Sequence, residues 1–244
     1  MGMLDKVKLP RKICPIIFML DASGSMGGAP IGAVNSAMET ILPELISMND
    51  ENPDAEIRVA AMSFSEDNKI QWISGENGLV KPENFTWQDL QAYGGTPMGA
   101  AFLELERVLH VDTGFMNQAG GSVAPVLFLL SDGEPTDDYR SGLAVLQSNN
   151  WYKVAARIAV GYGTESNDEL LAEFTKNTET VLHTNDPREL KTKIQFIVIT
   201  SSMVASSGKG SLSGDTDSDD TTEATAKALQ AQQPVLMPDP DEEW

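Results

Sequence analysis

The sequence predicts an α/β fold in which a doubly wound, mostly parallel central sheet with one antiparallel edge strand is flanked by helices. Short apolar runs alternate along the chain with segments whose apolar residues recur at helical spacing. The first run, residues 14–20, is continuously apolar, which is typical of a parallel strand buried on both faces. Residues 57–64 and 69–73 are separated only by a short polar stretch, which predicts a hairpin with the second strand antiparallel at the sheet edge.

The other elements follow from the same two patterns. Pro30 can begin a helix, because the first turn leaves backbone N–H groups unpaired in any case, and apolar residues then fall on one face up to residue 45. Further strands are expected at residues 123–130, 154–160 and 181–183, and further helices at residues 97–110, around 143–146, around 170–174 and at 187–202. This alternation predicts a single α/β domain without internal repeats.

The domain is expected to span residues 13–204, after an N-terminal lead-in of residues 1–12. From Ser206 the composition shifts to Ser, Gly, Asp and Thr, so residues 205–233 are predicted to be a flexible acidic linker with at most one short, weak helix at residues 223–232. Residues 234–244 combine apolar side chains with prolines and acids, a composition typical of a docking peptide that becomes ordered on a partner.

Composition narrows the classes of partner. The chain of 244 residues is 41% hydrophobic, enough for a sizeable core, and its formal net charge of −19 argues against nucleic acid or an anionic membrane as partner. The single cysteine excludes an intramolecular disulfide. No apolar run approaches the ~20 residues of a membrane-spanning helix, and the N-terminus lacks the apolar region of a secretory signal. We therefore expect a cytoplasmic protein.

Oxygen-bearing side chains follow two of the predicted strands. Asp21, Ser23 and Ser25 come directly after the first strand, Thr96 lies in a glycine-rich loop, and Asp132 follows a later strand. Hard oxygen ligands suit Mg²⁺, Mn²⁺ or Ca²⁺. Because the carboxyl ends of parallel strands meet at one sheet edge, these five residues are expected to form a cation site if the two strands are neighbours.

The three motifs resemble those of the von Willebrand factor A (VWA) domain, in which such residues form a metal-ion-dependent adhesion site, or MIDAS. Asp-x-Ser-x-Ser at residues 21–25, the Thr in a glycine-rich loop and Ser-Asp-Gly at residues 131–133 occur in the family's order. The resemblance covers about residues 11–204 and implies the VWA, Rossmann-like version of the fold. Within the family, the Gly-Gly-Thr-Pro-Met-Gly loop at residues 94–99 is most similar to bacterial TerY-like proteins of tellurite-resistance and stress loci.

The resemblance also implies roles for the five residues. Ser23 and Ser25 would bind Mg²⁺ directly, Thr96 directly or through water, and Asp21 and Asp132 largely through waters. A site built mainly from neutral hydroxyls leaves the ion short of negative charge, so a partner carboxylate can supply its last ligand. This chemistry serves recognition more than catalysis. The TerY-like resemblance implies partners in bacterial stress-response systems, where such genes lie beside those of a protein kinase and a PP2C-type phosphatase, the candidate partner pair.

Other interpretations of the same residues remain open. Each motif alone is compatible with a helix cap or a turn that binds no ion. A carboxylate after the first strand, together with Asp137 and Asp138 after a later one, resembles the haloacid-dehalogenase phosphatases, although Ser23 stands where their acid/base aspartate is needed. A third alternative is a VWA subunit of an AAA+ ATPase assembly.

Overall fold

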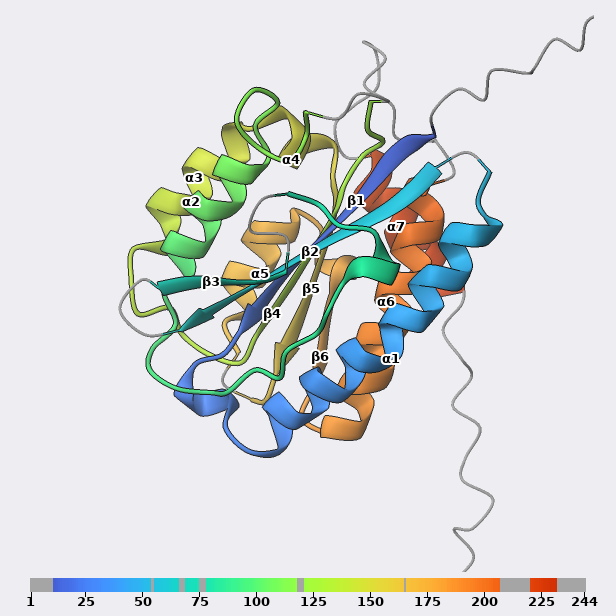
Figure 1. Cartoon of the computed structure of the whole chain (residues 1–244). Helices are drawn as coiled ribbons and strands as arrows, with labels where there is room; N and C mark the ends of the chain where they lie inside the picture. The colour runs from blue at the N-terminus through green and yellow to red at the C-terminus, as the bar shows by residue number, and fades with distance from the viewer. Residues whose placement is uncertain are drawn as a thin grey trace, which may run out of the picture.

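The structure is a computed structural model in which one mixed sheet carries helices on both faces (Figure 1). It describes residues 11–53, 55–65, 69–74, 78–117, 121–164, 166–206 and 220–231. Within these residues the sheet has six strands in the order β3-β2-β1-β4-β5-β6. The α/β fold class predicted from the alternating patterns is confirmed.

Five of the six described strands run parallel and one edge strand runs antiparallel. Their bounds are Lys12–Asp21 (β1), Ala55–Ser65 (β2), Lys69–Ser74 (β3), Val126–Ser131 (β4), Ala156–Tyr162 (β5) and Val181–Thr184 (β6). The pairs β1–β2, β1–β4, β4–β5 and β5–β6 are parallel, whereas β3 pairs antiparallel with β2 at the sheet edge. The predicted hairpin and its edge position are therefore confirmed.

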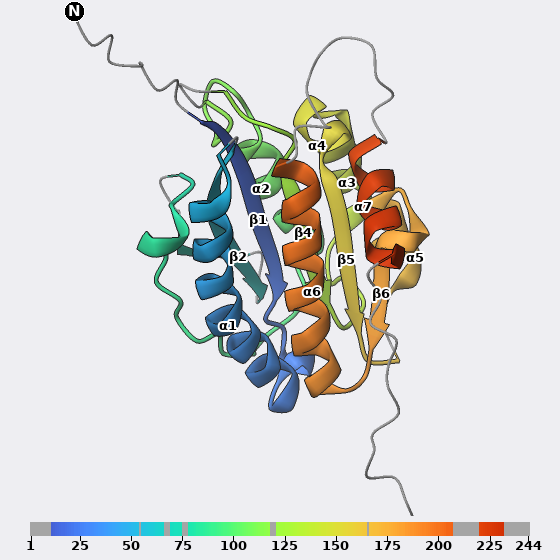
Figure 2. The ribbon, with the colours of Figure 1, turned by 90° about the vertical axis from the view of Figure 1, so that its right-hand side faces the viewer.

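The helices form one layer on each side of the sheet. On one face lie α1 (Ala29–Glu51), α6 (Pro187–Ser206) and α7 (Asp220–Ala231), which Figure 2 shows in front of the strands. On the other face lie α2 (Met98–Val108), α3 (Tyr139–Ser148), α4 (Asn150–Val154) and α5 (Asp168–Thr175). Short 3₁₀ turns complete the architecture at Gly24–Met26 (η1), Pro82–Asn84 (η2) and Thr178–Thr180 (η3).

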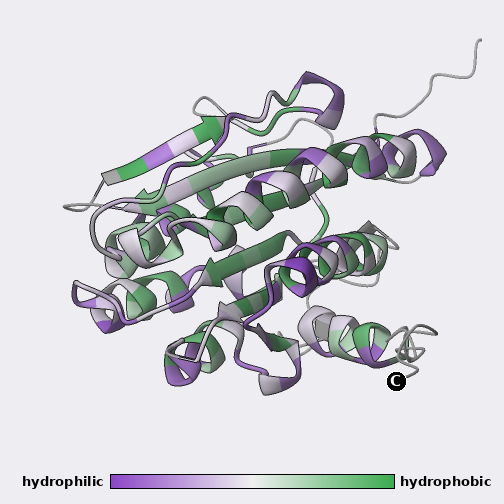
Figure 3. Cartoon of the chain, turned by 90° about the horizontal axis from the view of Figure 1, so that it is seen from below, coloured by the Kyte–Doolittle hydropathy of each residue, from purple (hydrophilic) through white to green (hydrophobic). Residues whose placement is uncertain are grey.

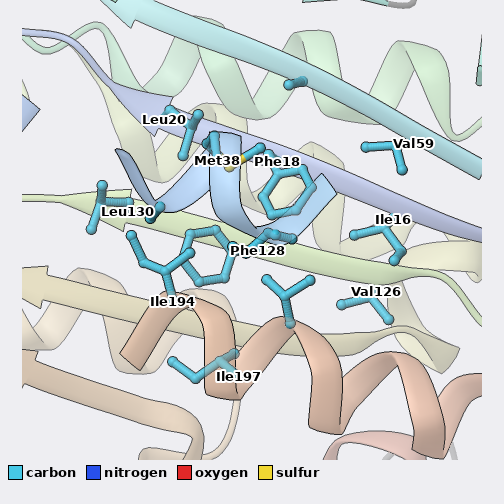
Figure 4. Close-up of a cluster of buried hydrophobic side chains, with 14 of the residues drawn as sticks. Ile16, Phe18, Leu20, Met38, Val59, Val126, Phe128, Leu130, Ile194 and Ile197 are labelled. Carbon is cyan, nitrogen blue, oxygen red and sulfur yellow. The ribbon is translucent and has the colours of Figure 1, made fainter. Parts of the chain in front are cut away.

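The central strands divide their side chains between two cores, because successive residues of a strand point to opposite faces. Ile16, Phe18 and Leu20 pack toward α1 and α6, whereas Ile17 and Met19 pack toward α2 and α3. Figure 4 shows the first of these cores, in which Phe18 meets Phe128 of β4 edge to face with ring centroids 5.7 Å apart. Figure 3 shows the apolar strands enclosed between helices whose outer surfaces are polar. Continuous apolar runs thus mark strands covered on both sides.

Helix α1 continues beyond residue 45, where its apolar pattern weakens, to Glu51. Its last turn is held by polar contacts. The buried side chain of Asn49 accepts a hydrogen bond from the backbone N–H of Ile57 in β2 at 2.9 Å. Arg11 donates to the backbone carbonyl oxygens of Asn49 and Asn52, both at 2.7 Å. These bonds satisfy carbonyl groups that a helix end leaves unpaired.

Helix α7 covers residues 220–231, which overlap the short, weak helix allowed at residues 223–232, and it packs against α6 and β5. Its buried face combines three threonines and an alanine with one leucine: Thr221, Thr222, Thr225, Ala226 and Leu229. The Thr222 hydroxyl donates to the Ala155 carbonyl at 2.9 Å and accepts from the Arg157 N–H at 3.3 Å. These contacts compensate for the low hydrophobicity that made the segment resemble a linker.

The remaining terminal predictions fall on other residues. The lead-in over residues 1–10, the linker over residues 207–219 and the docking peptide at residues 234–244 lie outside the described part of the chain. Among the helices that are described, none has the length and apolar content needed to cross a membrane.

Candidate metal centre

The candidate metal centre lies where the direction of chain progression across the sheet reverses. From β1 the chain moves outward to β2 and β3, and it later re-enters the sheet on the other side of β1 at β4. The register pairs Leu20 with Leu130, so that Asp21 and Ser131 stand side by side at the carboxyl ends of the two strands. Such a switch point is where open α/β sheets bind their ligands.

Three side-chain oxygens gather at this edge. The hydroxyl oxygens of Ser23 and Ser25 lie 3.0 Å apart, and the Ser25 hydroxyl donates to Oδ1 of Asp132 at 2.9 Å. The Ser23 hydroxyl lies 3.5 Å from the same carboxylate oxygen. Adjacent ligands of an octahedral Mg²⁺ at ~2.1 Å are separated by about 3.0 Å, so the spacing of these oxygens fits a hard cation.

Asp21 lies beneath the three oxygens and is fully buried. Its carboxylate accepts a hydrogen bond from the Ser23 N–H at 2.8 Å and one from the Ser131 hydroxyl at 2.6 Å. Burial, with a smaller contribution from the nearby Asp132, raises the pKa of Asp21 to about 6 against the opposing effect of these hydrogen bonds. Burial also raises the pKa of Asp132. Two partly desolvated carboxyl groups therefore face a position where a cation would stabilise their ionised forms.

The loop that carries Thr96 is bonded to both neighbouring loops. Gly94, at a φ of 71° that favours glycine, accepts a hydrogen bond from the Gly24 N–H at 3.0 Å. Thr96 exchanges two bonds with Thr136: its N–H donates to the Thr136 hydroxyl at 3.0 Å, and its carbonyl accepts from the Thr136 N–H at 2.9 Å. The Thr96 side chain is buried, and its hydroxyl has no hydrogen-bond partner within the described residues. A hydroxyl in that state is available to a cation.

The structure thus joins Asp21, Ser23, Ser25 and Asp132 by direct hydrogen bonds, whereas Thr96 is joined to them through backbone contacts. In the described residues no group of three or more His, Cys, Asp or Glu side chains could hold a metal ion. The donor set is instead dominated by hydroxyl groups, which suits Mg²⁺, Mn²⁺ or Ca²⁺ better than softer ions.

Three supporting residues were not predicted as part of the site. Ser131 orients Asp21, Thr136 holds the Thr96 loop, and Asp137 accepts hydrogen bonds from the N–H groups of Gly99 and Ala100 at 2.8 and 2.9 Å. Ser131 could have been found from the register of neighbouring strands, because it stands level with Asp21. The contacts of Thr136 and Asp137 depend on loop geometry and carry no local sequence signal.

The two aspartates that a phosphatase would use for metal binding are engaged elsewhere. The Asp137 carboxylate caps the first turn of α2, and Asp138 caps α3 by accepting from the Ser141 N–H at 3.3 Å and from the Ser141 hydroxyl. Both carboxylates thus accept hydrogen bonds from backbone N–H groups at helix N-termini, Asp138 as the N-cap residue of α3 and Asp137 from a neighbouring loop.

Helices α2 and α3 meet beside this loop without intervening side chains. A Cβ atom placed on Gly142 of α3 would collide with the backbone carbonyl of Gly99 in α2, and one on Gly99 would lie 2.6 Å from the Asp138 carbonyl oxygen. The loop between β4 and α3 is thus in backbone contact with the start of α2.

Comparison with known structures agrees with this fold. Similar solved structures include mussel byssus proximal thread matrix protein 1 with a zinc-occupied MIDAS motif (16% identity, TM-score 0.55, covering 76% of this chain and 47% of that one). A second is von Willebrand factor type A from Catenulispora acidiphila (17% identity, TM-score 0.56, covering 79% of this chain and 43% of that one). A third is the vWF domain of the type V pili tip protein Mfa5 from Porphyromonas gingivalis (11% identity, TM-score 0.53, covering 78% of this chain and 96% of that one).

The chain spans less than half the length of the mussel and Catenulispora chains that it matches. No curated protein sequence matches it. A family model of the von Willebrand factor type A domain matches residues 16–195, which include all five predicted metal-site residues. From β1 to α6, the chain belongs to the von Willebrand factor type A domain family.

Proposed function

We propose that the protein is a non-enzymatic, metal-dependent binding module that docks an acidic residue of a partner protein at a MIDAS-type Mg²⁺ site. The observation that carries the proposal is the convergence of the Ser23, Ser25 and Asp132 oxygens within 3.5 Å at the β1–β4 switch point. Asp21 supports them from below, and Thr96 contributes its unpartnered hydroxyl from the adjacent loop.

The chemistry of the donor set favours recognition. A bound divalent cation would supply a positive centre that accepts a carboxylate as a further ligand. Ser23, Ser25 and Thr96 are neutral, so they hold such an ion while leaving much of its charge for a partner's Asp or Glu. The zinc-occupied motif in the mussel protein supports occupancy by a divalent metal. Mg²⁺ is proposed here, with Mn²⁺ or Ca²⁺ as alternatives, because oxygen atoms dominate the donors.

The finer assignment rests on the resemblance of residues 94–99 to TerY-like proteins. It would make the module a cytoplasmic adaptor in a bacterial stress response, with a kinase and PP2C-type phosphatase pair as partners. A net charge of −19 disfavours nucleic acid and anionic membranes as binding surfaces. An adaptor role also agrees with the use of Asp137 and Asp138 as helix caps.

Calorimetric titration of the whole chain with Mg²⁺, and separately with Mn²⁺, tests the proposal. One site per chain is expected. Ser25→Ala should weaken binding at least about tenfold, because it removes a directly bound oxygen at an exposed position where the fold tolerates the change. Ser47→Ala, at an exposed serine of α1 far from this loop in sequence, is the matched control and should titrate like the wild type.

Two results would contradict the proposal. Equal Mg²⁺ affinity in the Ser25→Ala protein and the wild type would remove Ser25 from the ligand set. Mg²⁺-dependent hydrolysis of p-nitrophenyl phosphate that disappears in Asp21→Asn would instead establish the phosphatase alternative.

A further inference from the structure

A cluster of three polar side chains lies where the edge strand β6 meets the start of α5 (Figure 2). His183 of β6 stands opposite Gly161 of β5 in the sheet register. Ser166 belongs to the loop that leads into α5, and Asp168 is the first residue of that helix. Strand β5 separates β6 from β4, and the three residues of this β6–α5 site, Ser166, Asp168 and His183, take no part in the metal centre.

The imidazole ring of His183 is supported from two sides. A Cβ atom built on Gly161 would lie 2.6 Å from ring atom Nδ1 and 2.8 Å from Cε1, so the ring occupies space that glycine leaves open. Nδ1 also lies 3.3 Å from the Ser166 hydroxyl oxygen, and this hydroxyl donates to Oδ1 of Asp168 at 3.3 Å. Imidazoles that bind metal ions are typically oriented in this way, by a hydrogen bond from the ring nitrogen that does not touch the ion.

These hydrogen bonds assign the proton of the neutral ring to Nδ1. The Ser166 hydroxyl has one hydrogen and donates it to Asp168, so its oxygen accepts from the Nδ1–H group of His183. Nε2 then carries a lone pair, and it lies 3.5 Å from Oδ1 of Asp168. A nitrogen lone pair and a carboxylate oxygen therefore face each other without a hydrogen between them, an arrangement that a cation would stabilise.

The distance between these two acceptors fits a tetrahedral ion. Zn²⁺ binds imidazole nitrogen and carboxylate oxygen at ~2.0–2.2 Å, which places two such ligands about 3.4 Å apart. The chain's other histidine differs, because Nε2 of His110 lies 2.7 Å from Oε1 of Glu106, a hydrogen-bond distance that leaves no room for an ion. Imidazole suits Zn²⁺, whereas Mg²⁺ prefers oxygen ligands.

We propose that His183 and Asp168 bind a Zn²⁺ ion between β6 and α5, with Ser166 as a positioning residue. Within the described part of the chain, no group of three His, Cys, Asp or Glu side chains could hold a metal ion, so the pair has no third ligand of these types there. The side chains of His183 and Asp168 are 40% and 72% exposed, so water can fill the remaining positions of the ion. This inference does not rest on the proposed function.

Titration of the full chain with Zn²⁺ in excess Mg²⁺, followed by the nitrogen NMR signals of the imidazole rings, tests this inference. Excess Mg²⁺ competes for the metal centre, and the two histidines give separate ring signals that His183→Gln assigns. We expect Zn²⁺ to shift the Nε2 signal of His183 in a saturable way before it affects His110. Asp168→Asn should weaken this binding at least about tenfold, a loss typical even of groups that only orient a ligand.

Three further variants separate the β6–α5 site from its surroundings. Glu169→Gln is the matched control, because it removes the same charge from an exposed acid on the first turn of α5 and should leave the Zn²⁺ affinity unchanged. Ser166→Ala should weaken Zn²⁺ binding about tenfold and raise the fraction of rings protonated at Nε2, which the same spectra report. Ser25→Ala, in the metal centre, should change neither quantity.

Three outcomes would overturn the inference. The first is that the ring signals of His183 do not shift in a large excess of Zn²⁺. The second is equal Zn²⁺ affinity at His110 and His183, which would mean adventitious binding by any exposed imidazole. The third is equal affinity in Asp168→Asn and Glu169→Gln, which would remove the carboxylate from the ligand set. Each of these results would leave the Mg²⁺ titration of the metal centre, and with it the proposed function, unaffected.

Discussion

Ser131 is a single residue that connects the end of one strand to the centre of the site. Its hydroxyl donates to Oδ2 of Asp21 at 2.6 Å, while the other carboxylate oxygen accepts from the Ser23 N–H. Asp21 is therefore held in one orientation from two sides. Residues that orient metal ligands through hydrogen bonds typically affect metal affinity even though they do not touch the ion.

Removing this hydroxyl gives a prediction at the residue scale. Ser131→Ala should lower Mg²⁺ affinity by about tenfold and the free energy of unfolding of the metal-free protein by about 1–3 kcal/mol, because a buried carboxylate loses a donor. Calorimetric titration and urea unfolding measure the two effects. Ser122→Ala is the matched control, since the buried Ser122 hydroxyl lacks a hydrogen-bond partner in the described structure. If both variants behave alike, Ser131 has no orienting role.

At the scale of elements, the edge strand β3 is fastened to α2 through one carboxylate. Glu104 of α2 accepts from the Trp72 indole N–H at 2.7 Å and from two N–H groups of Arg107 at 2.8 and 2.7 Å. The hydrogen bonds from Arg107 lower the pKa of Glu104 against the effect of burial, and the bond from Trp72 adds to the lowering. The ionised form is thus more favourable in the folded chain than in the unfolded one.

The sign of this shift predicts a pH dependence. Because the pKa of Glu104 is lowered in the folded state, its ionised form adds to the free energy of unfolding above the unfolded-state pKa of ~4.3. This stabilisation is lost as the pH falls through the folded-state pKa. Glu104→Gln should therefore be less stable than the wild type at pH 7, and the gap should narrow below about pH 4. Chemical unfolding of the variant and the wild type at pH 7 and below about pH 4 measures this difference in stability. Glu39→Gln, at an exposed site on α1, should show no such narrowing.

At the scale of the whole molecule, the order and type of most elements could be predicted because patterning alone determines them. The apolar run of β1 and the short gap before β3 required no tertiary information. Four of the five candidate metal-site residues follow strand ends, and the β1–β4 adjacency brings these four into contact. Adjacency itself could not be read from local sequence, because it depends on the topology of the sheet.

Helix α7 shows what patterning cannot reveal. Its buried face contains three threonines, and their polarity resembles that of a linker until their hydroxyls find partners. Thr225, for example, is fully buried and donates to the Thr221 carbonyl at 2.8 Å. Burial of such a face depends on a partner surface distant in sequence, here the start of β5, so no window of residues could predict it.

The domain should therefore depend on residues that the sequence assigned to a tail. A chain ending at Ser206 is expected to lose about 3–5 kcal/mol of unfolding free energy, since it exposes the surface that Leu229 covers and leaves the backbone groups of Ala155 and Arg157 without Thr222. A chain ending at Ala231 is the control and should unfold like the full chain. Equal midpoints for the two truncations in urea would contradict a structural role of α7.

The contact between Gly99 and Gly142 bears on how α2 and α3 open locally. Where Gly99 meets Gly142, no side chain separates the backbones of α2 and α3, so one helix cannot shift there while the other stays in place. We expect local opening of one helix to expose amides of the other, so that the pair exchanges its amide hydrogens as one unit. Asp137 caps α2 from the loop leading into α3, and it belongs to that unit as well. We therefore expect amides in the wall of the metal centre that carries Thr96 and Thr136 to exchange as slowly as those of the two helices.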